Sequence, residues 1–148
     1  MTDTGAGFYE GSTDITRTYA FGEVSQIMKD HFTLVAISNL NLASPIFKKG
    51  CCGMNFDYLA RKPFWDRGLD FNHGTGHGVG YLLNIHEGPA GFRYTYRAGE
   101  SDAFQPGMVI TDEPGIYIEG SHGVRLENEL LVCEGCLLYT SPSPRDCS

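Results

Sequence analysis

The sequence predicts an α+β domain, because strand-like and helix-like patterns occupy separate stretches of the chain. Alternating β-favouring residues mark 2–21, and apolar residues at helical spacing mark 24–43 and 55–66. Strand patterns return at 108–118 and 124–133, after a stretch that is dense in glycine. A regular α/β protein would instead alternate single strands and helices along its whole length.

The first segment, 2–21, is rich in Thr, Tyr, Phe and Gly, and it predicts two strands joined by a turn. Asp3 falls in the first strand and Asp14 in the second. Side chains that face each other across an antiparallel pair lie on the same face. We therefore expect a hairpin to bring the two carboxylates together.

Two helices are expected next. In helix 24–43 one face is apolar except for Asn39, and Pro45 ends or kinks the helix. We expect His31 to be a core histidine. The predicted buried face comprises Val24, Met28, Phe32, Val35 and Leu42, widened by Ile27 and Leu34. In helix 55–66 the apolar face comprises Phe56, Leu59, Ala60 and Phe64.

The last part of the chain returns to strands. The stretch 108–118 predicts a strand that breaks at Pro114, since proline lacks the backbone N–H that a central strand needs. The stretch 124–133 has Val124, Leu126, Leu130 and Val132 at even spacing, and it predicts one continuous strand.

The charge balance is acidic, with 11 basic and 18 acidic residues and a net charge of −7. Nucleic acids and anionic membranes bind basic surfaces, so neither is an expected partner. No apolar run approaches the roughly 20 residues that span a bilayer, and residues 1–5 do not resemble a signal peptide. We therefore expect a cytoplasmic protein.

Residues 136–148 differ in composition from the rest. The stretch 136–146 resembles the translation of a transposon-end adapter that is used to prepare sequencing libraries. Segments of this kind are excluded from reasoning about a fold. We expect a folded domain at 1–135 and a disordered, adapter-derived tail at 136–148.

Five candidate metal ligands stand beside glycine, proline or strand-like sequence: Asp3, Asp14, His77, Glu113 and Glu127. Converging carboxylates are costly to bury unless cations neutralise them. Two divalent ions would do so, and one imidazole among hard oxygen ligands suits Mn, Co or Zn. Each acidic residue taken alone is more often a surface charge or a turn residue than a metal ligand.

Histidines give a second signal. His73, His77 and His86 fall in one glycine-rich region, where imidazoles are candidate ligands or proton-transfer groups.

Six motifs, in this order, resemble those of the M24 metallopeptidases. They are DTG at 3–5, GSTDITRT at 11–18, HGTGHGVG at 73–80, NIHEGP at 84–89, TDEPG at 111–115 and RLEN at 125–128. The resemblance extends over 2–134. It implies the pita-bread fold, an α+β domain of two pseudo-symmetric halves, of which 1–135 would be a catalytic domain incomplete at both ends. The histidine motifs are most similar to the cytosolic, long type of Xaa-Pro aminopeptidase.

The resemblance implies a role for each candidate residue. Asp14 and Glu127 would bridge two divalent ions, most simply Mn(2+), with Co or Zn as alternatives. Asp3 would complete the ligands of one ion, and His77 with Glu113 those of the other.

Four residues have implied catalytic roles. Glu113 would also relay a proton to the leaving nitrogen, and His86 would hydrogen-bond the substrate or the oxyanion. His73 would shape the pocket, and Arg125 would orient the last ligand.

The implied activity is metal-dependent hydrolysis of the N-terminal Xaa-Pro bond, which releases the first amino acid from peptides with proline in second position. The parent enzyme would be a homodimer. Two alternatives stay open, namely a prolidase that acts on Xaa-Pro dipeptides and a non-catalytic pita-bread module used for binding. We expect the isolated chain to bind metal weakly and to be inactive.

Overall fold

The computed structural model describes residues 1–134 and 139–142, and it confirms the α+β class. The elements are β1 (Thr2–Phe8), β2 (Gly11–Arg17), α1 (Gln26–Ala43), β3 (Phe47–Lys48), the 3₁₀ helix η1 (Gly53–Asn55), α2 (Asp57–Trp65), β4 (Gly76–His77), β5 (Gly91–Phe92), β6 (Val109–Asp112), β7 (Gly115–Ile118), β8 (His122–Arg125), β9 (Asn128–Glu134) and β10 (Tyr139–Pro142).

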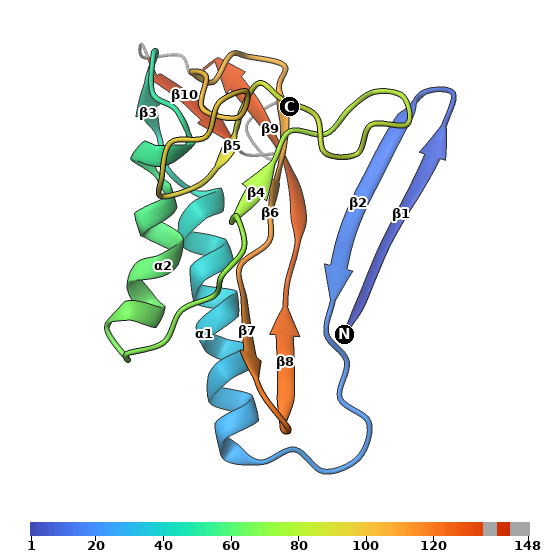
Figure 1. Cartoon of the computed structure of the whole chain (residues 1–148), viewed down its shortest axis with the longest axis vertical. Helices are drawn as coiled ribbons and strands as arrows, with labels where there is room; N and C mark the ends of the chain where they lie inside the picture. The colour runs from blue at the N-terminus through green and yellow to red at the C-terminus, as the bar shows by residue number, and fades with distance from the viewer. Residues whose placement is uncertain (135–138, 143–148) are drawn as a thin grey trace.

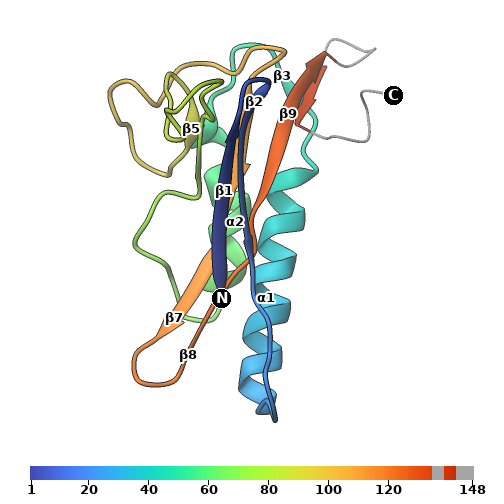
Figure 2. The same cartoon turned by 90° about the vertical axis from the view of Figure 1, so that its right-hand side faces the viewer.

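The elements form layers. Helices α1 and α2 lie on one side of strands β6 to β9, and the hairpin of β1 and β2 lies on the other side (Figure 1). Figure 2 views the molecule from the hairpin side, with β1 and β2 toward the viewer. Every residue of β1 is exposed, whereas β2 is partly buried, so the hairpin is attached to the body through β2.

Helix α1 begins two residues later than the sequence predicts. The Ser25 hydroxyl accepts a hydrogen bond from the Met28 N–H at 3.4 Å, which caps the first turn. The predicted buried face is partly wrong, because Ile27 and Phe32 are exposed. The residues of α1 that are buried are His31, Leu34, Val35, Ser38, Asn39 and Leu42.

The buried polar residues of α1 have specific hydrogen-bond partners. His31 Nδ1 lies 2.8 Å from His122 Nε2, so the expected core histidine has a specific partner. The Asn39 side-chain amide donates to the Asp112 carbonyl oxygen at 3.0 Å. Hydrogen bonds of this kind offset the cost of burying polar groups.

Two apolar clusters fill the space between the helices and the strands. Helix α2 contributes to both, through Ala60 in one and Phe64 in the other. Leu59, which the sequence assigns to the same face, is 36% exposed. The two clusters hold the helices against the strands that carry the site described below.

The predicted break of strand 108–118 is confirmed, since β6 ends at Asp112 and β7 begins at Gly115. The prediction of one continuous strand over 124–133 is wrong. Strands β8 and β9 are separated at residues 126–127, and β8 pairs with β7 whereas β9 pairs with β6.

The two breaks face each other. Asp112 is paired with Asn128, and Gly115 is paired with Arg125. One antiparallel register fits both pairs, so the ladder continues in register across the gap. Residues 113–114 and 126–127 therefore lie opposite one another, free of strand hydrogen bonds to each other.

Strand β10 pairs with β3 and β9. It lies inside the segment 136–148, for which the sequence predicts a disordered, adapter-derived tail. The rest of that segment lies outside the described residues, and its adapter origin stays a prediction. Within residues 1–134 and 139–142, no helix has the length and apolar character that crossing a bilayer requires.

Candidate metal centre

The β1–β2 hairpin brings Asp3 and Asp14 to one face, as the sequence predicts. Asp3 is paired with Thr16, and Gly5 is paired with Asp14. Partners across an antiparallel ladder share a face, and so do residues two apart on one strand. The two carboxylates and the Thr16 side chain therefore point the same way, toward the body of the protein.

Strand β2 is held to the segment beyond β8 through side chains as well as backbone. The Thr16 hydroxyl donates to Glu127 Oε2 at 2.7 Å, and the Glu127 N–H donates to the Thr16 carbonyl oxygen at 3.1 Å. The Asp14 N–H donates to Glu129 Oε1 at 2.8 Å. These bonds fix Glu127, which is 1% exposed, against the two aspartates of the hairpin.

Glu113 and His77 are positioned by a second set of bonds. The Glu113 N–H donates to the Thr75 carbonyl oxygen at 2.8 Å, and the His77 N–H donates to Thr111 Oγ1 at 3.0 Å. The Thr111 hydroxyl in turn donates to Glu113 Oε1 at 3.2 Å. A side chain at Gly76 would place its Cβ 1.9 Å from the Thr111 carbonyl oxygen, so only glycine allows β4 to approach this closely.

The tautomer of His77 is informative. Its Nδ1 lies 3.0 Å from the Gly78 carbonyl oxygen, which can only accept, so Nδ1 carries a proton. In the neutral ring Nε2 then presents a lone pair, and it lies 3.4 Å from both Asp14 Oδ2 and Glu113 Oε1. Three facing lone-pair donors repel one another, and a cation among them would turn that repulsion into coordination.

All five predicted ligands come together. The described residues contain three groups whose ligand atoms lie within 4.8 Å of one another. These groups are Asp3–Asp14–Glu127, His77–Glu113–Glu127 and Asp14–His77–His86. The first two groups share Glu127.

The acidities of the carboxyl groups reflect the same crowding. Burial raises the pKa of Glu113 from 4.5 to about 7, and the neighbouring Asp14 adds to the rise. Burial likewise raises the pKa of Glu127 to about 7, and the charge of Glu113 raises it further. The pKa of Asp14 is also raised, mainly by burial. The cluster is therefore short of positive charge, and the donor set fits divalent cations.

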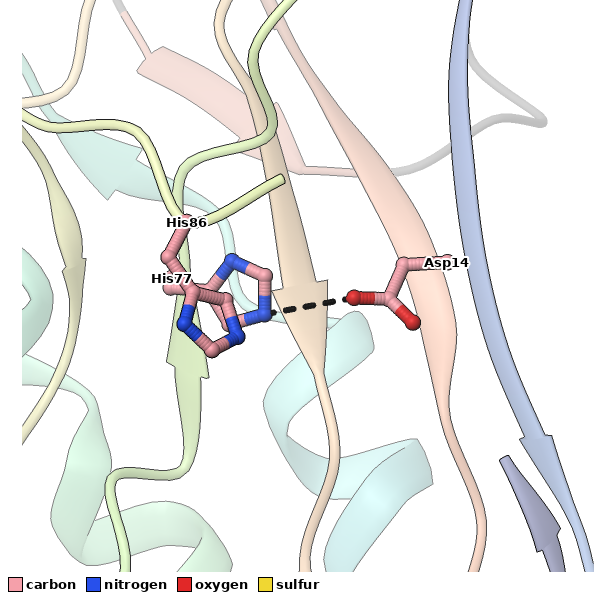
Figure 3. Close-up of side chains that lie close together, drawn as sticks. All are labelled: Asp14, His77 and His86. Atoms are coloured by element: carbon pink, nitrogen blue, oxygen red, sulfur yellow. Dashed lines mark ion pairs between the residues drawn. The ribbon is translucent and has the colours of Figure 1, made fainter. Parts of the chain in front are cut away.

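His86 lies beside the cluster. Its ring centre is 4.0 Å from that of His77, and the two rings are inclined by 64°. Figure 3 shows both imidazoles on the side of the site opposite Asp14, with the contact between His77 and Asp14 dashed. His86 itself is exposed, so its ring is open to a ligand in the adjoining space.

His73 ends a directed chain of hydrogen bonds. Its Nδ1 lies 2.8 Å from the Gly74 carbonyl oxygen and so carries a proton, which leaves Nε2 to accept from the Tyr117 hydroxyl at 2.8 Å. Arg125 donates to the same hydroxyl at 3.0 Å and also to Asp3 Oδ2. Burial lowers the pKa of His73, in keeping with a neutral ring.

Arg125 reaches Glu127 indirectly. The guanidinium Nε donates to Thr16 Oγ1 at 3.2 Å, and the Thr16 hydroxyl donates to Glu127. The contact that Arg125 makes with a candidate ligand is its ion pair with Asp3. The sequence-based role of Arg125 in orienting Glu127 therefore requires Thr16 as an intermediary.

Two adjoining cavities open onto the cluster and share His77, His86 and Glu113. The first is about 420 Å³ and is lined by Asp3, Gly5, Ala6, Gly7, Ser12, Thr13, Asp14, His77, Leu83, Ile85, His86, Glu113 and Glu127. The second is about 390 Å³ and is lined by His73, Gly74, Gly76, His77, His86, Glu87, Gly88, Arg93, Arg97, Glu100 and Glu113.

Sequence reasoning missed Thr16, Thr111, Tyr117 and Glu129 as parts of the site. Strand alternation contained a signal for the first, because Thr16 is two residues from Asp14 and so lies on the same face. Nothing comparable marks Tyr117, whose hydroxyl meets Arg125 and His73 only in the folded chain.

The model of metallopeptidase family M24 matches residues 1–134. The probable Xaa-Pro aminopeptidase P of Botryotinia fuckeliana is 47% identical over 134 residues, and the corresponding protein of Aspergillus flavus is 44% identical over the same length. Each match covers 90% of this chain and 20% of the relative. The chain thus spans about a fifth of the length of these curated relatives.

Solved structures agree. The crystal structure of the X-prolyl aminopeptidase from Caenorhabditis elegans, described as a cytosolic enzyme with a di-nuclear active site, matches with a TM-score of 0.86 and 38% identity, over 94% of this chain and 23% of that one. The prolidase from Pyrococcus furiosus matches with a TM-score of 0.74 and 32% identity, over 90% and 38%. The fold is the pita-bread type that the motifs imply. The chain belongs to metallopeptidase family M24.

Proposed function

We propose that the protein hydrolyses the N-terminal Xaa-Pro bond of peptides, with two divalent cations held by the cluster described above. The observation that carries the proposal is that two ligand groups share the buried Glu127. The names of the relatives supply the substrate class, because the probable Xaa-Pro aminopeptidases P are 44–47% identical to this chain.

Five side chains would hold the two ions. Asp3 would serve one ion, His77 and Glu113 the other, and Asp14 and Glu127 both. Four carboxylates with a single imidazole form a hard donor set, which favours Mn²⁺, with Co²⁺ or Zn²⁺ as alternatives. The raised pKa values of Glu113 and Glu127 support the assignment, since these groups lack the positive charge that ions would supply.

When bound, a pair of divalent ions polarises the scissile carbonyl group and lowers the pKa of a water molecule between them. The chain's own residues would handle protons and orientation. Glu113 would accept a proton from the attacking water and pass it to the leaving nitrogen. His86 lies where it can donate a hydrogen bond to the substrate carbonyl oxygen.

The second cavity supports a further part of the proposal. It adjoins the cluster and is lined by His73 and His86, so both imidazoles would contact a peptide bound there. His73 is kept neutral by burial and accepts from Tyr117, which fixes its orientation toward the cavity.

The test compares two substrates with Mn²⁺ present. Hydrolysis of a tripeptide or longer peptide with proline in second position, releasing the first residue, is the expected result for the full-length protein. Preference for an Xaa-Pro dipeptide would establish the prolidase alternative, which the match to the Pyrococcus furiosus prolidase keeps in view. Failure to cleave either peptide, with folding verified, would leave the non-catalytic binding module.

The remaining parts of the proposal concern the setting. A cytoplasmic location follows the description of the Caenorhabditis elegans enzyme as cytosolic. A homodimeric parent protein stays a prediction, which sedimentation of the full-length protein would test.

A further inference from the structure

Helix α2 contains an ion pair whose two side chains are almost completely buried. Arg61 Nε lies 2.6 Å from Asp57 Oδ2, and the two side chains are 1% and 0% exposed. Burying two charges costs more than their attraction returns unless further hydrogen bonds satisfy both groups. Both side chains therefore need further hydrogen-bond partners.

Arg61 binds the segment that leads to the first histidine of the site. Its NH1 donates to Asp70 Oδ1 and to the Phe71 carbonyl oxygen, each at 2.7 Å, and its NH2 donates to the His73 carbonyl oxygen at 2.8 Å. The guanidinium carbon lies 4.1 Å from the centre of the Phe71 ring and 4.7 Å from that of Tyr94. One side chain thus fixes three successive points of an irregular segment.

Asp57 binds the next residues of the same segment. Its Oδ1 accepts from the Thr75 hydroxyl at 2.5 Å. The Thr75 carbonyl oxygen accepts from the Glu113 N–H at 2.8 Å, and the Thr75 N–H donates to the Phe92 carbonyl oxygen at 2.9 Å. The path from the ion pair to a candidate metal ligand is therefore two hydrogen bonds long.

We propose that Arg61 and Asp57 form a positioning pair, which sets the places of His73 and Glu113 through Thr75 and thereby determines how tightly the cluster holds metal. The proposal rests on the proposed function, because it assigns Glu113 to a metal. It adds a requirement that lies outside the ligand set. Neither member of the pair belongs to the three ligand groups.

A purely structural role predicts something different. If the pair only stabilised α2, its loss would lower the stability of the whole chain, as the loss of any buried hydrogen bond does. Ser38 provides the matched control, since its hydroxyl is fully buried and donates to the Ala60 carbonyl oxygen of the same helix at 2.6 Å. Within residues 1–134 and 139–142, no hydrogen bond joins the Ser38 side chain to the segment 70–75.

The experiment compares Thr75→Val, Thr75→Ser and Ser38→Ala with the unmutated chain, which is called the parent from here on. Valine keeps the shape of threonine and removes the hydroxyl that binds Asp57, whereas serine keeps the hydroxyl. Two quantities are measured, namely hydrogen exchange of the Glu113 amide without metal and the affinity for Mn²⁺ by calorimetric titration. Circular dichroism and thermal unfolding establish that each variant is folded.

For Thr75→Val we expect faster exchange at Glu113 and Mn²⁺ binding weakened about 10-fold or more, the range seen when groups behind metal ligands are lost. Thr75→Ser is expected to restore both quantities. Ser38→Ala is expected to lower the melting temperature while leaving both unchanged.

Two results have distinct meanings. If Thr75→Val lowers the melting temperature yet leaves the Glu113 exchange as in the parent, the positioning proposal is overturned. If neither this chain nor the full-length protein binds Mn²⁺, the proposed function fails, while the exchange data still decide whether the pair positions Glu113.

Discussion

Thr16 and Glu127 are 111 residues apart in the sequence, and a 2.7 Å hydrogen bond joins the hydroxyl of one to the carboxylate of the other. Both are almost completely buried. Because Thr16 also accepts from Arg125, a single hydroxyl links the hairpin, the shared carboxylate and the guanidinium. The Thr16 side chain thus fixes the position of the hairpin relative to residues 125–127.

The first prediction follows from that bond. Thr16→Val removes the hydroxyl with little change in shape, and we expect it to weaken Mn²⁺ binding by about 10- to 100-fold, because the shared carboxylate loses its orienting donor. Thr16→Ser, which keeps the hydroxyl, is the control and should bind like the parent. Calorimetric titration measures both, and equal affinities for the valine variant and the parent would refute the expectation.

The second prediction concerns pH. The pKa of Glu127 in the folded chain is about 7, above its ordinary value of 4.5, so the folded state holds this proton more firmly than the unfolded state. The metal-free parent therefore loses the corresponding stability as pH rises from about 4.5 to about 7, and does not regain it above that pH. Glu127→Gln removes the titration.

In EDTA, urea unfolding of both chains at pH 5 and pH 8 checks this. From pH 5 to pH 8, we expect the free energy of unfolding of the variant to rise relative to that of the parent by about 1–3 kcal/mol. The reason is that the variant avoids a buried negative charge. The same variant should lose the response to Mn²⁺. A stability difference that stays constant with pH would contradict the prediction.

The third prediction is that metal stabilises the chain. A ligand that binds only the folded state raises the free energy of unfolding, by about 2.7 kcal/mol at 100 times its dissociation constant. We expect Mn²⁺ to raise the melting temperature of the parent, EDTA to reverse the rise, and His77→Gln to diminish it. His31→Gln is the control, because His31 is a buried histidine bonded to His122, outside the three ligand groups. It should melt earlier yet keep its response to Mn²⁺, and an equal loss of response in both variants would argue against this site.

The fourth prediction concerns Asp112. Among the described residues neither of its carboxylate oxygens has a hydrogen-bond partner, and the side chain is 0% exposed. Burial holds its pKa well above the ordinary value, with the charges of Glu113 and Glu127 adding to the shift. Asp112 therefore costs stability once pH rises far enough to ionise it.

Asp112→Asn should raise the free energy of unfolding relative to the parent at alkaline pH, because the amide cannot ionise at this buried position. The gain should shrink as the pH is lowered, because burial raises the pKa of Asp112 and so favours its neutral form. Urea unfolding in EDTA measures it. A variant less stable than the parent at alkaline and at lower pH would show that the carboxylate has an essential partner.

The sequence predicted the hairpin and the common face of Asp3 and Asp14, because strand alternation and one turn are local properties. It also predicted the five ligand-type residues that the structure brings within a few ångströms of each other. The two predictions have different sources. The hairpin follows from local strand alternation, whereas the ligand set depends mainly on the resemblance of the six motifs to family M24.

Tertiary contacts account for the errors. Periodicity did not show that Ile27 and Phe32 of α1 stay exposed. It also gave no sign of the partners of His31 and Asn39, which lie 91 and 73 residues away. The break before β9 was invisible for the same reason. Glu127 directs its N–H to the Thr16 carbonyl oxygen of another strand, and even apolar spacing gives no sign of that exchange.

The attachment of the exposed β1–β2 hairpin to the rest of the chain depends on the metal site. Two of the five candidate ligands sit on this arm, and the other three belong to the body. A cation bound by both sets of ligands would connect the hairpin to the body, which otherwise contact each other mainly through polar groups. Removal of the cation by a chelator would therefore first increase the mobility of the N-terminal hairpin. Proteolysis would then cut the hairpin while the helices and the inner strands remain intact.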